Sequence, residues 1–523
     1  MNPFRFKRFL AQPFIVTATL LASTHLAAAQ VTSVSQLSDV EPTDWAFQAL
    51  QSLAERYGCI AGYPDRTYDG HNAITRYEFA AGLNACLDRI VGTVGNGEAI
   101  APTDLATVRR LQDEFAAELS ALRGRVEGLE SRISQLESDT FSTTTKLQGE
   151  IAFVLADAWG GNGISDDDND VQTVFYNRGR LNFFTSFTGR DRLTTRIQFG
   201  NLGNTFADEL HTNEGRLTFD GDNDDAAILH RLHYAFPVTD DLHVTLMANV
   251  GAHLFYSDTF NPGLDSGNGV TGALSRFAER NAIYNSGAGG KGIGVRYRLN
   301  DVLEISAGYL ARGGNDPNAG SGLFNGNYSA LGQIVLEPTN RLKFGFTYVH
   351  AYDVSEGRRF GWGGTGTNLG ILSPSALDAA VSGLTESQLT TGVVSHSYGL
   401  QASWNPSRQF RISAWGGFTD ASLVGLGDAE IWNYALALSF PDLGLPGNLG
   451  AIIVGAEPYL GSLDVPGDTD FENDVPWHIE GLYKIQLSEN LAVTPGFIWL
   501  VNPNQNSDNE GIFIGTLRTT FTF

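Results

Sequence analysis

The sequence predicts an all-β transmembrane barrel of about 16 antiparallel strands, with a small α-helical module and a coiled-coil stalk on its N-terminal side. Three observations lead to this prediction. From residue 146 to residue 523, segments of alternating apolar and polar residues follow one another. Short polar turns and longer connections alternate between these segments. The last segment, "LRTTFTF", is itself an alternating strand that ends on Phe523.

The N-terminus predicts export. Arg5, Lys7 and Arg8 precede an apolar run that ends near Leu26, and small residues follow up to Ala29. A basic segment, a short apolar segment and small residues at the cut are typical of a secretory signal peptide, here residues 1–29. No later segment approaches the ~20 apolar residues that a membrane-spanning helix requires.

The net charge and the cysteines limit the partners of the chain. The formal charge of −24 makes nucleic acid an unsuitable partner. Cys59 and Cys86 are the two cysteines, and in an exported protein such a pair is expected to form a disulfide. A metal site would need more ligands than His71 supplies nearby, so no metal and no other cofactor is expected.

Residues 30–95 are expected to form the small helical module. The stretch "TDWAFQALQSLAERYG" carries its apolar residues at helical spacing. A second helix is expected to start at Thr75, where Glu78 at the third position completes a capping box. The segment between them, "GYPDRTYDGHNAI", is rich in turn residues.

Residues 103–140 carry a heptad pattern. Apolar residues and one glutamine occupy five a and five d positions: Leu105, Gln112, Leu119, Val126 and Ile133 at a, and Val108, Phe115, Leu122, Leu129 and Leu136 at d. This pattern predicts a coiled coil. The number of helices in it stays open, and a trimer would match the barrel.

The region 146–523 is read as the barrel itself. Strands are expected to begin near residues 147, 171, 192, 226, 241, 291, 301, 324, 341, 393, 408, 428, 448, 476, 490 and 510. The long connections, among them "TDASLVGLGD", would all lie at the external end and the short turns in the periplasm. A soluble β-sandwich also has frequent turns, but it has no reason to gather its long connections at one end.

One face of these strands would meet lipid and the other would line the lumen. The lumen phase collects nine basic residues: Arg178, Arg180, Arg196, Arg231, Arg296, Arg298, Lys343, Arg411 and Arg518. Acidic residues gather instead in the connections expected outside: Asp166, Asp167, Asp168, Asp170, Asp220, Asp222, Asp224, Asp225, Asp468, Asp470, Glu472 and Asp474. This predicts an acidic mouth above a basic wall.

The helical module resembles a known family. The stretches "LSDVEPTDWAFQAL", "GYPD" and "ITRYEFAAGL" resemble the S-layer homology domain, a cell-wall anchoring module. The resemblance implies binding to a peptidoglycan-linked polysaccharide. Arg76 would pair with an anionic sugar substituent, with Trp45, Gly62 and Tyr63 nearby. The structural alternatives are that Trp45 belongs to the core and that Arg76 caps its own helix.

The order of the three regions resembles the cyanobacterial outer-membrane porins, which join one S-layer homology module, a coiled coil and a barrel similar to the carbohydrate-selective porins. The resemblance implies a homotrimer in outer-membrane lipid that is tethered to the wall and passes inorganic ions and iron. A structural tether with little conductance and a carbohydrate channel are the alternatives. Trp404, Trp415 and Trp432 could line a path for sugars. No enzyme is expected, because the nucleophile, zinc and phosphate-binding motifs are missing.

General porins fold their third external loop into the lumen. The corresponding segment here is 254–289, which contains the short helical pattern "GALSRFAERNAIY". Arg276, Glu279 and Arg280 would then lie at the constriction.

Overall fold

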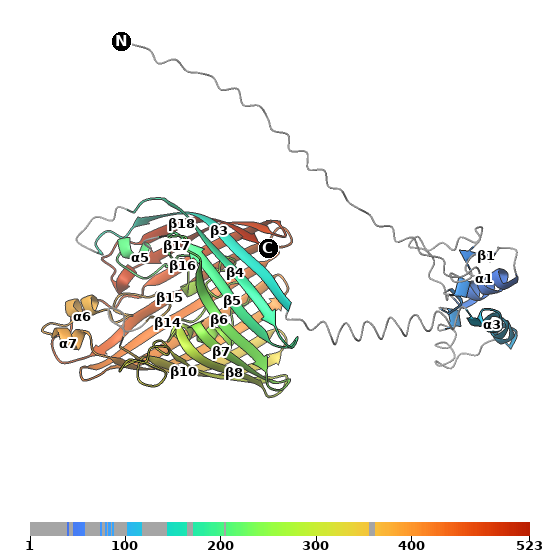
Figure 1. The fold of residues 1–523 in the computed structure, drawn as a ribbon. Helices are drawn as coiled ribbons and strands as arrows, with labels where there is room; N and C mark the ends of the chain where they lie inside the picture. The colour runs from blue at the N-terminus through green and yellow to red at the C-terminus, as the bar shows by residue number, and fades with distance from the viewer. Residues whose placement is uncertain are drawn as a thin grey trace, which may run out of the picture. The chain divides into compact units, whose positions relative to one another are not determined.

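A computed structural model describes residues 39–40, 45–57, 74–75, 79–80, 82–84, 86–87, 102–117, 144–164, 171–202, 206–354 and 361–523. The chain divides into two compact units, Met1–Thr140 and Phe141–Phe523, and each is described by itself (Figure 1). The predicted signal peptide lies outside the described residues. So do Cys59, Gly62, Tyr63 and Arg76.

The N-terminal unit is a small helical module. It contains α1 (Trp45–Tyr57), α3 (Pro102–Glu114) and a two-stranded antiparallel pairing of β1 (Asp39–Val40) with β2 (Ile74–Thr75). Its core is formed by Ala46, Phe47, Leu50, Leu53, Phe79, Leu83, Cys86, Val108, Leu111 and Phe115. Among the described residues, no helix is long and apolar enough to cross a membrane.

Helix α3 contains the first residues of the predicted coiled coil. Val108 and Phe115, both predicted at d, are buried in the core of the module together with Leu111, which the heptad reading leaves outside the seam. Leu105, predicted at a, is 43% exposed. Spacing of three and four residues places this apolar stripe on one helix face, which here packs within its own unit. The predicted coiled coil beyond residue 117 lies outside the described residues.

The second unit is a closed β-barrel, and this part of the predicted fold is confirmed. Neighbouring strands in the chain pair antiparallel throughout, and β18 pairs with β3 to close the ring. The strands are β3 (Thr144–Gly160), β4 (Val174–Ser186), β5 (Arg192–Gly200), β6 (Ile228–Pro237), β7 (Leu242–Gly251), β8 (Gly290–Arg298), β9 (Leu303–Ala311), β10 (Tyr328–Thr339), β11 (Leu342–Asp353), β12 (Val393–Ser407), β13 (Phe410–Leu423), β14 (Gly427–Pro441), β15 (Leu449–Asp464), β16 (Trp477–Ser488), β17 (Leu491–Val501) and β18 (Ile512–Thr522).

One predicted long connection is wrong. The segment 419–428 was expected to be an external loop, but β13 and β14 continue through it and leave only residues 424–426 between them. Leu423 pairs with Gly427, and Leu426 N donates to Leu423 O at 2.9 Å. Ala421 and Leu423 are buried inside the barrel. Burial of Ala421 and Leu423 favours the strand conformation. The strands therefore extend closer to the turn than the polar residues of this segment suggested.

Four of the remaining long connections carry short helices. These are α5 (Phe206–Glu209), η2 (His253–Phe255), η3 (Phe277–Glu279), η4 (Ala282–Asn285), α6 (Pro374–Ala380), α7 (Glu386–Leu389) and η5 (Pro503–Gln505). Helices α6 and α7 lie at one end of the barrel, drawn in orange in Figure 1, and the C-terminus lies toward the other end. The long connections therefore mark one end of the barrel and the short turns the other.

The two faces of each strand differ in chemistry. In β11, Phe344 and Phe346 are each 45% exposed on the outer face, whereas Gly345 and Thr347 are buried on the inner face. Trp404 and Trp432 also lie exposed on the outside. An apolar outer band of this kind is what a lipid-facing barrel requires.

Candidate functional site

The connection between β7 and β8, residues 252–289, lies inside the barrel. On one side it contacts β10, β11 and β13. Gln333 Nε2 donates to Asp258 O at 2.9 Å, and Lys343 Nζ lies 3.2 Å from the Asp258 carboxylate. Asn281 Nδ2 donates to Gly416 O at 3.2 Å. The tip of the loop is therefore held on the inner wall.

The same loop is held on the far side by β16 and β18. Glu480 accepts hydrogen bonds from Leu274 N at 2.7 Å and from Ser275 N at 2.9 Å. Arg518 Nη2 donates to Gly272 O at 2.7 Å. Since its partners stand on both sides of the barrel, loop 252–289 crosses the lumen.

Glycines in the wall make room for two aromatic side chains of this loop. A Cβ at Gly294 or Gly308 would overlap the side chain of Tyr256, and a Cβ at Gly345 would overlap the ring of Phe260. Glycine permits this close approach because it has no Cβ. The loop thus packs directly against the wall.

The three predicted constriction residues all lie in loop 252–289. Arg280 is fully buried and donates to Asp265 at 2.7 and 2.9 Å and to Glu279 at 2.5 Å. Burial alone would raise the pKa of Asp265, but the Arg280 guanidinium outweighs this effect and holds that pKa below its usual range. Arg276 instead reaches out of the loop and donates to Asp220. Arg280 and Glu279 therefore brace the loop from within.

Asp220 does not belong to an acidic mouth. It is 2% exposed and accepts from Arg276 and, at 2.5 Å, from Arg216 Nε. The reason is that loop 201–227 folds onto loop 252–289, as shown by the 2.7 Å hydrogen bond from Thr218 N to Leu274 O. The other acidic residues of the mouth that the structure describes are exposed or half-buried: Asp222, Asp224, Asp225, Asp468, Asp470, Glu472 and Asp474. Asp166, Asp167, Asp168 and Asp170 lie outside the described residues.

A cavity of about 460 Å³ lies on the long-loop side of loop 252–289. We call it the outer cavity. Six arginines line it, namely Arg178, Arg180, Arg216, Arg231, Arg276 and Arg312, together with residues of loops 201–227 and 354–392. Three carboxylates form ion pairs with these arginines: Asp220, Glu150 with Arg180 at 3.4 Å, and Asp353 with Arg312 at 3.6 Å. Positive charge predominates.

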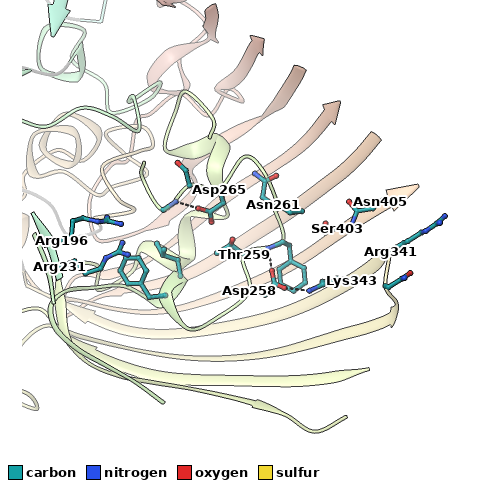
Figure 2. Close-up of a pocket in the computed structure, with 17 residues that line it drawn as sticks. Arg196, Arg231, Asp258, Thr259, Asn261, Asp265, Arg341, Lys343, Ser403 and Asn405 are labelled. Carbon is teal, nitrogen blue, oxygen red and sulfur yellow. Dashed lines mark hydrogen bonds and ion pairs between the residues drawn. The ribbon is translucent and has the colours of Figure 1, made fainter. Parts of the chain in front are cut away.

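A second cavity, the inner cavity, measures about 470 Å³ and extends to the short turn between β10 and β11. Figure 2 shows Arg196 and Arg231 together on one wall and Lys343 with Arg341 across from them. Arg231, Leu254, Phe255 and Gly267 line both cavities. The two cavities adjoin at these four residues, which we call the neck.

A third cavity of about 300 Å³ adjoins the inner one through Asp258 and Lys343. Arg296 and Arg298 line it. The two remaining residues of the predicted basic wall contact the loop: Arg411 Nη1 donates to Pro262 O at 3.4 Å, and Arg518 is fully buried under the loop. All nine predicted basic residues thus face the interior, and seven of them line one of the three cavities, whereas Arg411 and Arg518 do not.

The sequence interpretation missed a buried cluster in the wall. His478 Nδ1 lies 2.8 Å from Glu457, and its Nε2 lies 3.6 Å from Glu480. Glu457 also accepts from Gly215 N at 2.7 Å and from Gly366 N at 2.9 Å. Since these glycines belong to loops 201–227 and 354–392, the cluster holds two loops in addition to loop 252–289. Glu457, His478 and Glu480 lie at lumen-facing positions of the strand pattern, and this was the signal that could have revealed the cluster.

The predicted tryptophan path is not assembled. Trp404 and Trp432 lie on the outer face, and Trp415 is buried with its ring centroid 6.1 Å from that of Phe277. In the described part of the chain, no group of three or more histidine, cysteine or acidic side chains could hold a metal ion.

In the N-terminal module, Trp45 is half-buried and packs against the core, and the Arg110 guanidinium lies 3.7 Å from its ring centroid. Cys86 is buried and disulfide-bonded. Its pairing with Cys59 stays a prediction, because Cys59 is outside the described residues.

Comparison with known families identifies both parts. The model of the carbohydrate-selective porin, OprB family, matches residues 103–523, and that of the S-layer homology domain matches residues 36–80. The chain belongs to the carbohydrate-selective porin family. The predicted resemblance is thereby confirmed. Porins of this family are channel proteins, and this one is an outer-membrane protein whose N-terminal module is consistent with a periplasmic position.

Known proteins are similar to this chain over different shares of its length. An uncharacterized protein of Nostoc sp. is 45% identical over 517 residues, which cover 95% of this chain and 86% of that protein. The outer membrane protein SlpA of Thermus thermophilus is 36% identical over 110 residues, 20% of this chain and 12% of that protein. The solved structure of Pseudomonas putida OprB at high pH covers 75% of this porin and 96% of that chain, with 12% identity and a TM-score of 0.47.

Proposed function

We propose that this porin passes inorganic ions and small polar solutes by diffusion through the outer cavity, the neck and the inner cavity, with loop 252–289 as its constriction. The observation that carries the proposal is the neck. Arg231, Leu254, Phe255 and Gly267 line both cavities, so the two spaces adjoin on opposite sides of the loop. A tether with a closed barrel would have no need of paired cavities lined with guanidinium groups.

A neck flanked by guanidinium groups should form a narrow channel that prefers anions. Arg178, Arg196 and Arg231 succeed one another from the outer to the inner cavity. In the part of the chain that the structure describes, none of them forms an ion pair with a carboxylate. Positive charge in a narrow passage attracts anions and repels cations.

Single-channel recording in planar bilayers tests the proposal. We expect discrete current steps in KCl and, under a salt gradient, a reversal potential of the sign set by chloride. Replacing chloride with a large organic anion should reduce the current. Folded, inserted protein that gives no steps would contradict the transport function and leave the structural tether.

A carbohydrate-selective channel is the second candidate. The family match favours it, and so do the neutral hydrogen-bonding side chains Thr259, Asn261, Ser403 and Asn405 in the inner cavity. Uptake of glucose by liposomes that contain the protein would support this candidate. Absence of uptake from liposomes that conduct KCl would exclude it.

We also propose that the S-layer homology module binds the peptidoglycan-linked polysaccharide through Arg76 with Trp45, Gly62 and Tyr63, and that the protein is a homotrimer assembled through its barrel and coiled coil. The module match at residues 36–80 supports the wall contact. Iron as a solute and cleavage of a signal peptide after Ala29 remain predictions of the sequence.

A further inference from the structure

Two arginines of the inner cavity stand directly opposite each other. Arg196 of β5 and Arg231 of β6 are Cα partners in the antiparallel ladder. Like charges at directly opposed positions destabilise a sheet. In the described residues, neither side chain forms an ion pair with a carboxylate that would relieve the repulsion.

Neutral neighbours hold both guanidinium groups in place. Arg196 Nε donates to Asn182 Oδ1 at 2.7 Å. The Arg231 guanidinium lies 3.6 Å from the centroid of the Phe255 ring. These contacts fix the orientation of the two groups without neutralising their charges. A site whose groups are already oriented loses little conformational entropy when a ligand binds.

Each guanidinium retains a donor without a partner. Arg196 is 7% exposed, and its Nη1 has no hydrogen-bond partner among the described residues. The same holds for Nε of Arg231. A buried donor without an acceptor costs free energy, and such groups are uncommon in folded proteins. Both residues line the inner cavity, where a small rotation of either side chain would turn its covered donor toward an acceptor.

The carboxylates of the cavity are engaged elsewhere. Asp258 forms its ion pair with Lys343 at 3.2 Å, and Asp265 forms its own with Arg280 at 2.7 Å. Arg196 and Arg231 therefore remain as a pair of positive charges with free donors. Guanidinium groups bind the oxygens of phosphate with two parallel hydrogen bonds.

We propose that Arg196 and Arg231 form a binding subsite for a phosphate-class oxyanion in the inner cavity. The proposal deepens the proposed function, on which it rests for the route by which the anion enters. A volume of about 470 Å³ admits inorganic phosphate and also a phosphorylated monosaccharide. Thr259, Asn261 and Ser403 in the same cavity would then contact the sugar hydroxyls.

Current block and direct binding test this subsite in the full-length protein. The KCl current is recorded while inorganic phosphate, glucose 6-phosphate or glucose is added, and binding of inorganic phosphate to detergent-solubilised protein is measured by calorimetry. We expect both phosphates to reduce the current with saturation, and glucose to have no comparable effect. If only glucose 6-phosphate acts, the source is the phosphorylated sugar; if inorganic phosphate suffices, the sugar is dispensable. Either result supports the oxyanion subsite.

The variants Arg196→Gln and Arg231→Gln are compared with Arg190→Gln, which removes an arginine of the exposed β4–β5 turn that pairs with Asp240. Loss of a charge-assisted hydrogen bond should weaken phosphate binding about tenfold to a hundredfold in the first two variants and leave it unchanged in the third. Unchanged phosphate affinity in both cavity variants would overturn the subsite.

Thermal unfolding guards against misfolded variants. Without phosphate, each cavity variant should be at least as stable as the wild type, because the repulsion between the paired charges is removed. Phosphate should raise the midpoint of the wild type and not that of the variants. Channels that open but bind no phosphate refute the subsite alone, whereas phosphate binding without channels refutes only the proposed porin function.

Discussion

Glycines in the barrel wall differ in role according to the face on which they lie. Gly345 stands on the inner face of β11, where a Cβ would overlap Phe260 of loop 252–289. Gly332 of the neighbouring β10 has open space where its Cβ would be. Both glycines lie in regular strands, so the sequence alone assigns them the same tolerance to substitution. At the scale of single residues, the role of a wall glycine depends on whether a loop side chain packs against it.

Gly345→Val should therefore displace Phe260 and loosen the tip of loop 252–289. We expect a lower thermal midpoint, because overpacking typically costs about 1–3 kcal/mol, and a larger, noisier single-channel conductance. Gly332→Val is the matched control and should leave both measurements near the wild type. Equal behaviour of the two variants would show that the glycine does not set the position of the loop.

At the scale of elements, the long loops act together through buried polar contacts. Loop 201–227 contributes Glu214, which is 3% exposed and accepts from Thr212 Oγ1 at 2.7 Å and Asn504 N at 2.6 Å. Burial and the nearby Glu457 carboxylate raise the pKa of Glu214 to about 8, although those two hydrogen bonds lower it in part. The attachment of this loop is therefore expected to depend on pH.

The sign follows from proton binding. Between the ordinary pKa of a glutamate and pH 8, the folded protein keeps the Glu214 proton that the unfolded chain has lost. Stability from this group is fully present at low pH and declines as the pH rises to about 8. We expect the free energy of unfolding in urea to fall between pH 5 and pH 8 by up to ~1.4 kcal/mol per pH unit.

Glu214→Gln should make that decline shallower, whereas Glu209→Gln, at an exposed position of α5 in the same loop, should reproduce the wild-type profile. Superimposable profiles for Glu214→Gln and the wild type would show that this carboxyl group does not link loop attachment to pH.

At the scale of the whole molecule, the N-terminal module and the barrel carry separate chemistry. The module has its own core, and the barrel closes through β18 and β3 without any contribution from it. The two proposed functions, wall binding and transport, can therefore be separated by truncation.

Removal of residues 31–140 should leave single-channel conductance unchanged and abolish co-sedimentation with purified cell wall that carries its polysaccharide. The full-length protein is the control in both assays. If conductance disappears together with wall binding, although the barrel is folded, the N-terminal part is required for assembly of the channel.

Most of the fold could be predicted from the sequence because alternate residues of a barrel strand face lipid and lumen. This alternation is visible directly in the order of apolar and polar residues. Sequence reasoning found the inner phase of all nine basic residues for the same reason. It misjudged 419–428 and Asp220, since a tight turn and a buried carboxylate depend on which loops pack nearby. It also missed Glu457 and Glu480, which accept from backbone N–H groups of distant loops, and His478, which lies between these two carboxylates.

The sequence by itself determined the barrel, the alternation of inward-facing and outward-facing residues in its strands, and its family. Periodicity and short sequence motifs are local properties, so they can be read without the tertiary structure. Only the tertiary structure decided that loop 252–289 crosses the lumen, that Asp220 turns inward and that Arg196 faces Arg231 without a carboxylate. These features depend on strand register and on contacts between residues far apart in the chain. The free energy of these contacts is gained only when the barrel has closed and its loops have packed inside.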